Sequence, residues 1–110
     1  MAENEESEEG MKLGGNIELI GFGDFDRSEL AVVKKIVGNY VRKFSDMKKG
    51  LSSARLRVKT IHEREKSAVY EVNLQLVFDE GKPVVTNSSG RNLFFVVSDV
   101  LKSAEELLSS

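Results

Sequence analysis

The clearest pattern in the chain is an alternation of apolar and polar positions over the segment 70–78. Apolar side chains there take every second position, and polar residues fill most of the places between them. A period of two is typical of a β-strand that buries one face and exposes the other. The segment 54–62 shows the same alternation, and a short strand is predicted for 83–86 after a turn at 79–82. Hairpins are therefore expected to join these three strands.

Two other segments carry apolar residues at steps of three and four, the period of an amphipathic helix. The first helix is expected to start at Asp24 or Asp26, whose carboxylates can accept backbone N–H bonds, and to end at 48–50. Its apolar stripe consists of Leu30, Val33, Val37, Tyr40, Val41, Phe44 and Met47. The second helix follows a polar break at 87–92 and is expected to be capped by Ser89 or Asn92. Its apolar stripe consists of Phe94, Val97, Val100, Leu101, Ala104, Leu107 and Leu108.

An apolar run at 17–22, interrupted by Gly21 and followed by Gly23, is too short for a stable helix and predicts the first strand. The order of elements is then β-α-β-β-β-α. This order predicts an α+β fold with a four-stranded sheet and two helices packed on one face. Residues 15–110 are expected to form this single domain, and residues 1–14, which include five glutamates, a disordered acidic tail.

Composition excludes several classes of function. The chain has 110 residues with no cysteine and one histidine, so disulfides, thiolate chemistry and ordinary zinc or Ser-His sites are excluded or disfavoured. No convergent nucleophile, base or metal-binding set is visible, so we expect a protein that is not an enzyme and needs neither metal nor cofactor. No apolar run reaches the roughly 20 residues of a membrane helix, and the N-terminus is acidic, so a cytoplasmic location is expected.

The net charge of −2 hides a strong segregation of signs along the chain. The segment 27–66 carries twelve Lys or Arg residues against four acidic residues, a net charge of +8. Such a segment is either a solvated helix face with a charged loop or a footprint for a polyanion such as RNA. The candidate RNA-binding residues are Lys34, Lys35, Arg42, Lys43, Lys49, Arg55, Arg57, Lys59, Arg64 and Lys66.

The same alternation that buries one face of the sheet predicts what the other face presents. Its polar set is Arg55, Arg57, Lys59, Glu71, Asn73 and Gln75, which suits either water or an RNA backbone. If these arginines do not share a face with Lys35 and Arg42, a single basic footprint must be replaced by two patches.

The order of elements, together with the sequence from Val84 to Asp99, resembles the ribosome hibernation-promoting factor family, also called ribosome-associated inhibitor or protein Y, in its short form. The positions that match its pattern are Gly90, Asn92, Leu93, Phe94 and Asp99. The resemblance implies binding to the small ribosomal subunit near the mRNA and tRNA channel and suppression of translation. It also implies outward basic residues on both helices. The first helix offers Lys34, Lys35, Arg42 and Lys43 for this role, and the second helix offers Lys102.

The sequence therefore predicts an RNA-associated or ribosome-associated module that modulates translation, with ribosomal RNA or the small subunit as partner. The alternative is a protein interaction module, possible as a homodimer, that has the same fold and does not bind ribosomes. The outward position of Phe95 and the acidic outward face of the second helix favour this alternative, as does the prospect of an exposed strand edge.

Overall fold

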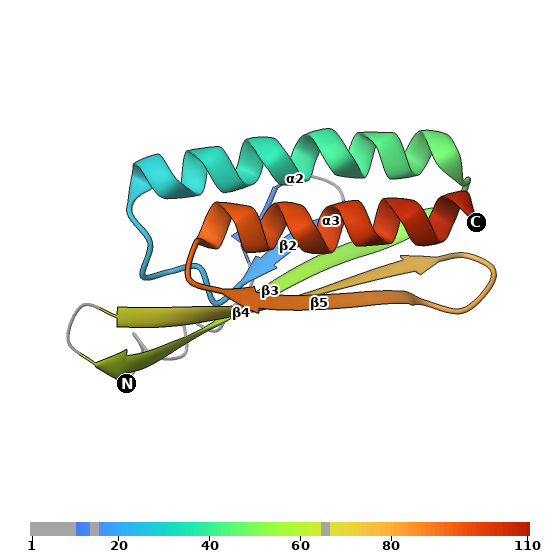
Figure 1. Ribbon diagram of the computed structural model, residues 1–110. Helices are drawn as coiled ribbons and strands as arrows, with labels where there is room; N and C mark the ends of the chain where they lie inside the picture. Colours follow the sequence, from blue (N-terminus) through green and yellow to red (C-terminus); the bar gives the residue numbers. More distant parts are fainter. Residues whose placement is uncertain (1–10, 14–15, 65–66) are drawn as a thin grey trace.

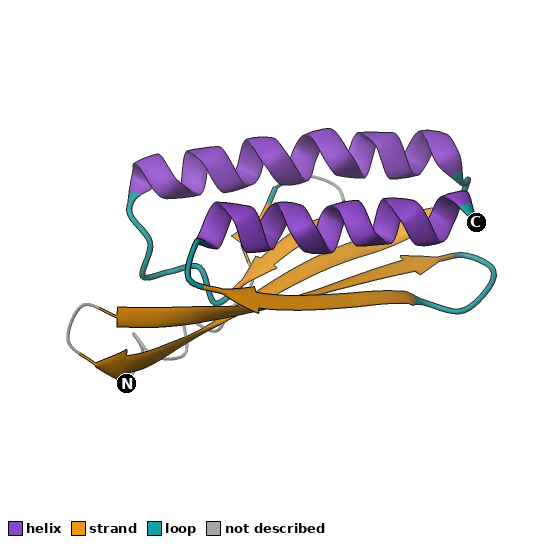
Figure 2. Cartoon of the chain, in the orientation of Figure 1, coloured by secondary structure: helices purple, strands orange, loops and turns teal. Residues whose placement is uncertain are grey.

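The computed structural model describes residues 11–13, 16–64 and 67–110 of the chain (Figure 1). Its elements are β1 (Met11–Lys12), β2 (Ile17–Ile20), α2 (Arg27–Met47), β3 (Leu51–Arg64), β4 (Ser67–Phe78), β5 (Val84–Gly90) and α3 (Leu93–Ser109). The strands form one sheet in the order β1-β2-β3-β4-β5. Both helices lie on the same side of this sheet, so the molecule has a helix layer and a sheet layer (Figure 2).

The predicted α+β fold is confirmed, because β2 to α3 follow the predicted order of four strands and two helices. The two-residue β1, which the sequence does not predict, adds a fifth strand at the edge of the sheet. β2 runs parallel to β3, which α2 makes possible by carrying the chain back along the sheet. The other pairs, β1 with β2, β3 with β4 and β4 with β5, are antiparallel. The paired β3 and β4 form a long hairpin, and the end of β3 and the start of β4 extend beyond the helix layer (Figure 1).

Both helices begin at residues that the sequence predicts as caps. Asp26 accepts a hydrogen bond from the Glu29 backbone N–H at 2.8 Å, and the Glu29 side chain accepts one from the Asp26 backbone N–H at 3.1 Å. This reciprocal pair satisfies two of the amide groups that a helix start leaves without partners. In α3 the Asn92 side chain accepts from the Phe95 backbone N–H at 3.0 Å. Ser89, the other candidate, lies inside β5.

The core lies between the sheet and the helix layer. Val33, Val37 and Phe44 of α2 are buried against Leu56 of β3 and Leu74 of β4 in one hydrophobic cluster, to which α3 also contributes. Buried polar groups are bonded: Thr86 is 7% exposed and donates its hydroxyl to the Val100 carbonyl at 2.8 Å, which ties β5 to α3.

Gly21 directly follows β2, at a point where a residue with a side chain does not fit. Its φ is +87°, and a Cβ placed there would lie 2.4 Å from the Val58 carbonyl oxygen. A side chain would therefore be strained by the backbone conformation and would collide with β3. The close passage of the loop beside β3 fixes where the chain leaves the sheet and enters α2.

Several boundaries differ from the sequence prediction. The polar segment expected as a break is mostly strand, because Asn87, Ser88 and Ser89 pair with β4 and this ladder overrides their weak strand propensity. β3 extends two or three residues beyond the predicted ends, to Leu51 and Arg64, through the same pairing with β4. The first strand ends at Ile20, before the glycine turn.

The expected acidic tail also needs a changed boundary. Met11 and Lys12, placed in the tail by the sequence, pair with Leu19 and Glu18 of β2 as a two-residue edge strand. The rest of the predicted tail, apart from residue 13, lies outside the described residues. Leu107, expected in the buried stripe of α3, is 55% exposed. Neither helix in the described part of the chain has the length and apolar character needed to cross a membrane.

Candidate nucleic-acid interface

The outer side of α2 carries four exposed cations that together we name the α2 basic face: Arg27, Lys34, Lys35 and Arg42. At about 100° per residue these positions lie within about 100° of the helix circumference, and at about 1.5 Å per residue they span roughly 22 Å. The stripe of Val33, Val37 and Phe44 points to the core on the other side. Arg27 is absent from the candidates named from the sequence, although its spacing of seven residues from Lys34 places both on one side of the helix.

The four cations of the α2 basic face form no ion pair with any residue that the structure describes. The positions between them are small or uncharged, and Gly38 lies among them with nothing within 4 Å of the place where a Cβ would stand. Asp46, one turn beyond Arg42, is the acidic residue at the C-terminal end of this side. The four cations give the α2 basic face a net charge of about +4, and Asp46 lies beyond its end.

Lys43, the neighbour of Arg42, is engaged by the second helix. Its Nζ lies 2.9 Å from Glu105 Oε2 of α3, and the two side chains are 56% and 28% exposed. The hydrogen bond to Glu105, together with the attraction of that carboxylate, raises the pKa of Lys43 above its ordinary value. A contact to an RNA phosphate would compete with this pair, so Lys43 is a weaker candidate than the neighbouring Arg42.

Lys49, Arg64 and Lys66 do not belong to the α2 basic face. Lys49 follows the end of α2 in a shallow surface hollow that Lys48, Asp79 and Glu80 also line, so the charges around it are mixed. Arg64 is the last residue of β3, and only its backbone is described. Lys66 lies outside the described residues.

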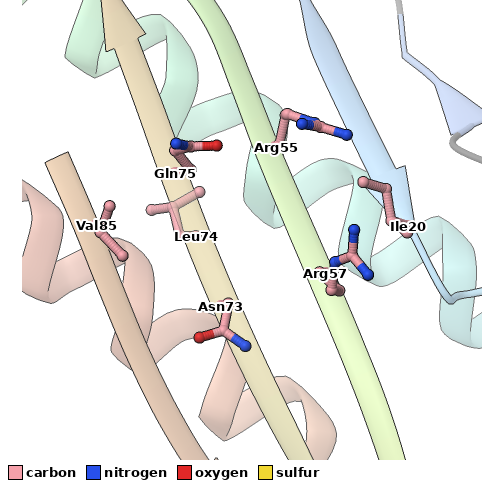
Figure 3. Close-up of a pocket in the computed structure, with 7 residues that line it drawn as sticks. All are labelled: Ile20, Arg55, Arg57, Asn73, Leu74, Gln75 and Val85. Carbon is pink, nitrogen blue, oxygen red and sulfur yellow. The ribbon is translucent and has the colours of Figure 1, made fainter. Parts of the chain in front are cut away.

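The remaining candidates, Arg55, Arg57 and Lys59, lie on the opposite side of the molecule from the helices. They alternate along β3 with Ala54, Leu56 and Val58, whose side chains are buried under the helix layer. Figure 3 shows Arg55 and Arg57 on the near side of the sheet, with the helices behind it. The basic segment therefore forms two separate surfaces, and the expectation of a single footprint is replaced by two.

We name the second surface the open sheet face and define it by the strand register. Its side chains are Glu18 and Ile20 of β2, Arg55, Arg57 and Lys59 of β3, Glu71, Asn73 and Gln75 of β4, and Val85, Asn87 and Ser89 of β5. The sequence prediction of its polar set is confirmed in this placement. Arg55 Nε lies 3.2 Å from Glu18 Oε1, and Lys59 is directly opposite Glu71. With three cations and two carboxylates, this face has a net charge of about +1.

The open sheet face is hollowed at its centre. A shallow hollow of about 220 Å³ is lined by Ile20, Arg55, Arg57, Asn73, Leu74, Gln75 and Val85 (Figure 3). A second hollow of about 210 Å³ adjoins it through Asn73 and is lined by Glu71, Val72, Asn73, Asn87, Ser88 and Ser89. Carboxamide side chains line both hollows, and serines contribute to the second hollow alone. This face therefore offers many hydrogen-bonding groups and little net charge.

The outward side of α3 has a different chemistry from that of α2. Phe95 is 76% exposed, as the sequence predicts for its outward position, and Asp99, Lys102 and Glu106 are exposed on the same helix. Ser88 donates to Asp99 at 2.7 Å, so this carboxylate is bound to β5. The resemblance implies basic residues on both helices, whereas α3 contributes Lys102 alone among acidic neighbours.

No protein-family model matches the chain, and no curated protein matches it either. The resemblance to hibernation-promoting factors therefore stays a prediction that rests on the order of elements and on the short motif around Gly90 and Asn92.

Proposed function

We propose that this protein is a non-enzymatic RNA-binding module that acts on the ribosome in the cytoplasm, with its α2 basic face against the phosphate backbone. The observation that carries the proposal is the cluster of Arg27, Lys34, Lys35 and Arg42 on one exposed side of one helix, without ion pairs among the described residues. Cations held on a rigid element without acidic partners are available to replace the counterions of a nucleic acid.

The small ribosomal subunit is the partner that the motif resemblance suggests, and the proposed effect is modulation of translation. Contacts of this kind depend on charge more than on base sequence. With about four phosphate contacts, the logarithm of affinity should fall with the logarithm of salt concentration at a slope of about −3. The affinity should therefore drop on the order of 50-fold between 50 and 200 mM salt.

The test is co-sedimentation of the full chain with purified small subunits across a salt series. The double variant Lys35→Ala/Arg42→Ala removes two proposed phosphate contacts, and we expect its salt slope to be shallower by about 1.5. Lys48→Ala and Lys82→Ala, combined, remove the same charge from exposed positions outside the α2 basic face and serve as the matched control. Absence of binding at low salt, or an equal loss in both double variants, would overturn the proposal.

Self-association is a second candidate function, and the edge strand β5 favours it. β5 lies at the end of the sheet order, and its seven residues carry no charge. Val85 within it is 55% exposed. Edge strands usually carry charges or proline, which oppose pairing with another chain. In this chain such residues lie on either side of β5 and not within it: Lys82, Pro83 and Arg91.

Light scattering coupled to size-exclusion chromatography tests this candidate. A homodimer formed through β5 should dissociate when Val85→Lys places a charge on the edge strand, because charged side chains on an edge strand oppose pairing with another chain. A monomer at the highest attainable concentration, for the unchanged chain, would remove self-association as a function.

A further inference from the structure

The polar side chains that line the hollow on the open sheet face have no part in the proposed phosphate binding by α2. Among the described residues, Arg57 forms no ion pair, and the carboxamides of Asn73 and Gln75 form no hydrogen bond. These three side chains come from neighbouring strands, with Arg57 directly opposite Asn73. Arg57 carries a charged guanidinium, and Asn73 and Gln75 carry neutral amides. These groups suit directional hydrogen bonds better than the neutralisation of charge.

Two nonpolar residues line the hollow beside these groups, and the exposed one, Val85, offers a surface against which a planar group can pack. Ile20 lies opposite Arg57 in the register and is 6% exposed, although its side chain is on the side away from the helices. Val85 lies opposite Gln75 and is 55% exposed. The sheet fixes the positions of all five side chains, with about 4.8 Å between neighbouring strands.

We infer that the open sheet face binds unpaired purine bases of single-stranded RNA. This inference rests on the proposed RNA-binding function and adds that the second surface contacts the bases. A guanidinium donates two parallel hydrogen bonds to guanine O6 and N7, and a carboxamide pairs with adenine N6 and N7. Arg57 supplies the first group, and Asn73 and Gln75 supply the second. No described residue of this face is aromatic, so the face of a bound base packs against the exposed Val85 while its edge accepts or donates the hydrogen bonds.

The charges on the open sheet face favour the neutral edge of a base over an anionic ligand. The open sheet face carries Glu18 and Glu71 beside its three cations, and Arg55 is already paired with Glu18. An acidic peptide or a bare phosphate would meet these carboxylates, whereas the edge of a neutral base would not. The α2 basic face, on the other side of the molecule, is the stronger site for a phosphate by charge alone.

The experiment is fluorescence anisotropy of the full chain with labelled single-stranded RNA decamers of adenosine or uridine at one fixed salt concentration. We expect the adenosine decamer to bind about tenfold more tightly than the uridine decamer, from one well-formed base contact. Asn73→Ala should reduce this ratio to less than about twofold, while Asn39→Ala, an exposed carboxamide on α2, should leave it unchanged. Arg57→Ala should lower the corresponding preference for a guanosine-containing decamer, with Lys82→Ala as the control of equal charge.

The outcomes separate this inference from the proposed function. A salt-dependent affinity with equal binding of adenosine and uridine decamers would overturn the inference and leave phosphate binding by α2 in place. A purine preference that depends on Asn73, with no effect of Lys35→Ala/Arg42→Ala, would support the inference and overturn the role of α2. Competition by millimolar inorganic phosphate that abolishes the preference would identify an anion site instead, and absence of any RNA binding would overturn both proposals.

Discussion

The cations of the α2 basic face and of the open sheet face come from one basic stretch of sequence, yet the two surfaces differ in charge and in hydrogen-bonding groups. On α2 the cations are exposed and lack acidic partners among the described residues, whereas on the sheet Arg55 is paired with Glu18 and Lys59 lies opposite Glu71. The helix offers charge with few other polar groups, and the sheet offers carboxamides with little net charge. A count of basic residues along the chain therefore does not say which surface binds an anion.

The largest expected effect comes from reversing charge on each surface in turn. Lys35→Glu/Arg42→Glu should weaken binding to single-stranded RNA on the order of 100-fold at 50 mM salt, because it removes two phosphate contacts and adds repulsion. Arg57→Glu/Lys59→Glu changes the charge by the same amount and should cost about tenfold, since the phosphates lie elsewhere. Anisotropy titrations measure both, with circular dichroism to confirm folding. Equal losses would mean that the two surfaces do not differ in function.

A smaller effect is expected within α2 itself, between two adjacent cations. Arg42→Ala should weaken RNA binding about fivefold, whereas Lys43→Ala should change it less than about twofold, because Lys43 is engaged by Glu105. Both substitutions remove one positive charge from neighbouring positions of the same helix, so each variant serves as a control for the other. A larger loss for Lys43→Ala would show that RNA displaces Glu105 and would place the interface on the side of α2 that faces α3.

The pair of Lys43 and Glu105 also predicts a dependence of stability on pH. The carboxylate raises the pKa of Lys43, so the contribution of the pair is fully present below the unfolded pKa of a lysine, about 10.4, and is lost as the pH rises through the folded pKa. Urea unfolding of the chain and of Lys43→Met, from pH 8 to pH 12, should give a difference in stability that shrinks above about pH 10. A constant difference would show that the lysine contributes through packing of its stem.

The smallest effect on binding is expected at Gly38, which lies among the cations of the α2 basic face. A Cβ there meets nothing within 4 Å, so Gly38→Ala should raise the free energy of unfolding by about 1 kcal/mol through helix propensity. RNA affinity should stay within about twofold, because the lysine and arginine side chains reach well beyond a methyl group. Thermal and urea unfolding measure the first part, and anisotropy the second. A marked loss of affinity would instead mean that the RNA backbone touches the helix at this glycine.

The sequence predicts the fold well where periodicity is strong and poorly where pairing decides the structure. The alternation around Leu56 and Leu74 identifies both long strands and their buried sides. The acidic residues Asp24 and Asp26 predict the start of α2, and the structure selects Asp26 as the cap. The strand at Asn87 and Ser88 has no such signal, because these residues gain strand structure from their neighbours in β4.

For the candidate site, the same alternation that predicts a half-buried β3 already requires Arg55 and Arg57 to lie on the side away from the helices. What the sequence cannot predict is which cations have partners. The pair of Lys43 with Glu105, and that of Arg55 with Glu18, join residues far apart in the chain. Such pairs depend on how α2 packs beside α3 and on the parallel register of β2 with β3, neither of which periodicity specifies.

The central claim is that the two surfaces contact different parts of one kind of ligand, and backbone amide chemical shifts test it most directly. Nitrogen-15-labelled protein is titrated with an adenosine decamer, first at low and then at high salt. We predict shifts in α2 from Arg27 to Arg42 that vanish as salt rises, together with shifts around Arg57 and Asn73 that persist. Shifts confined to α3 and the β5 edge, or shifts on both surfaces that vanish together with salt, would contradict the account.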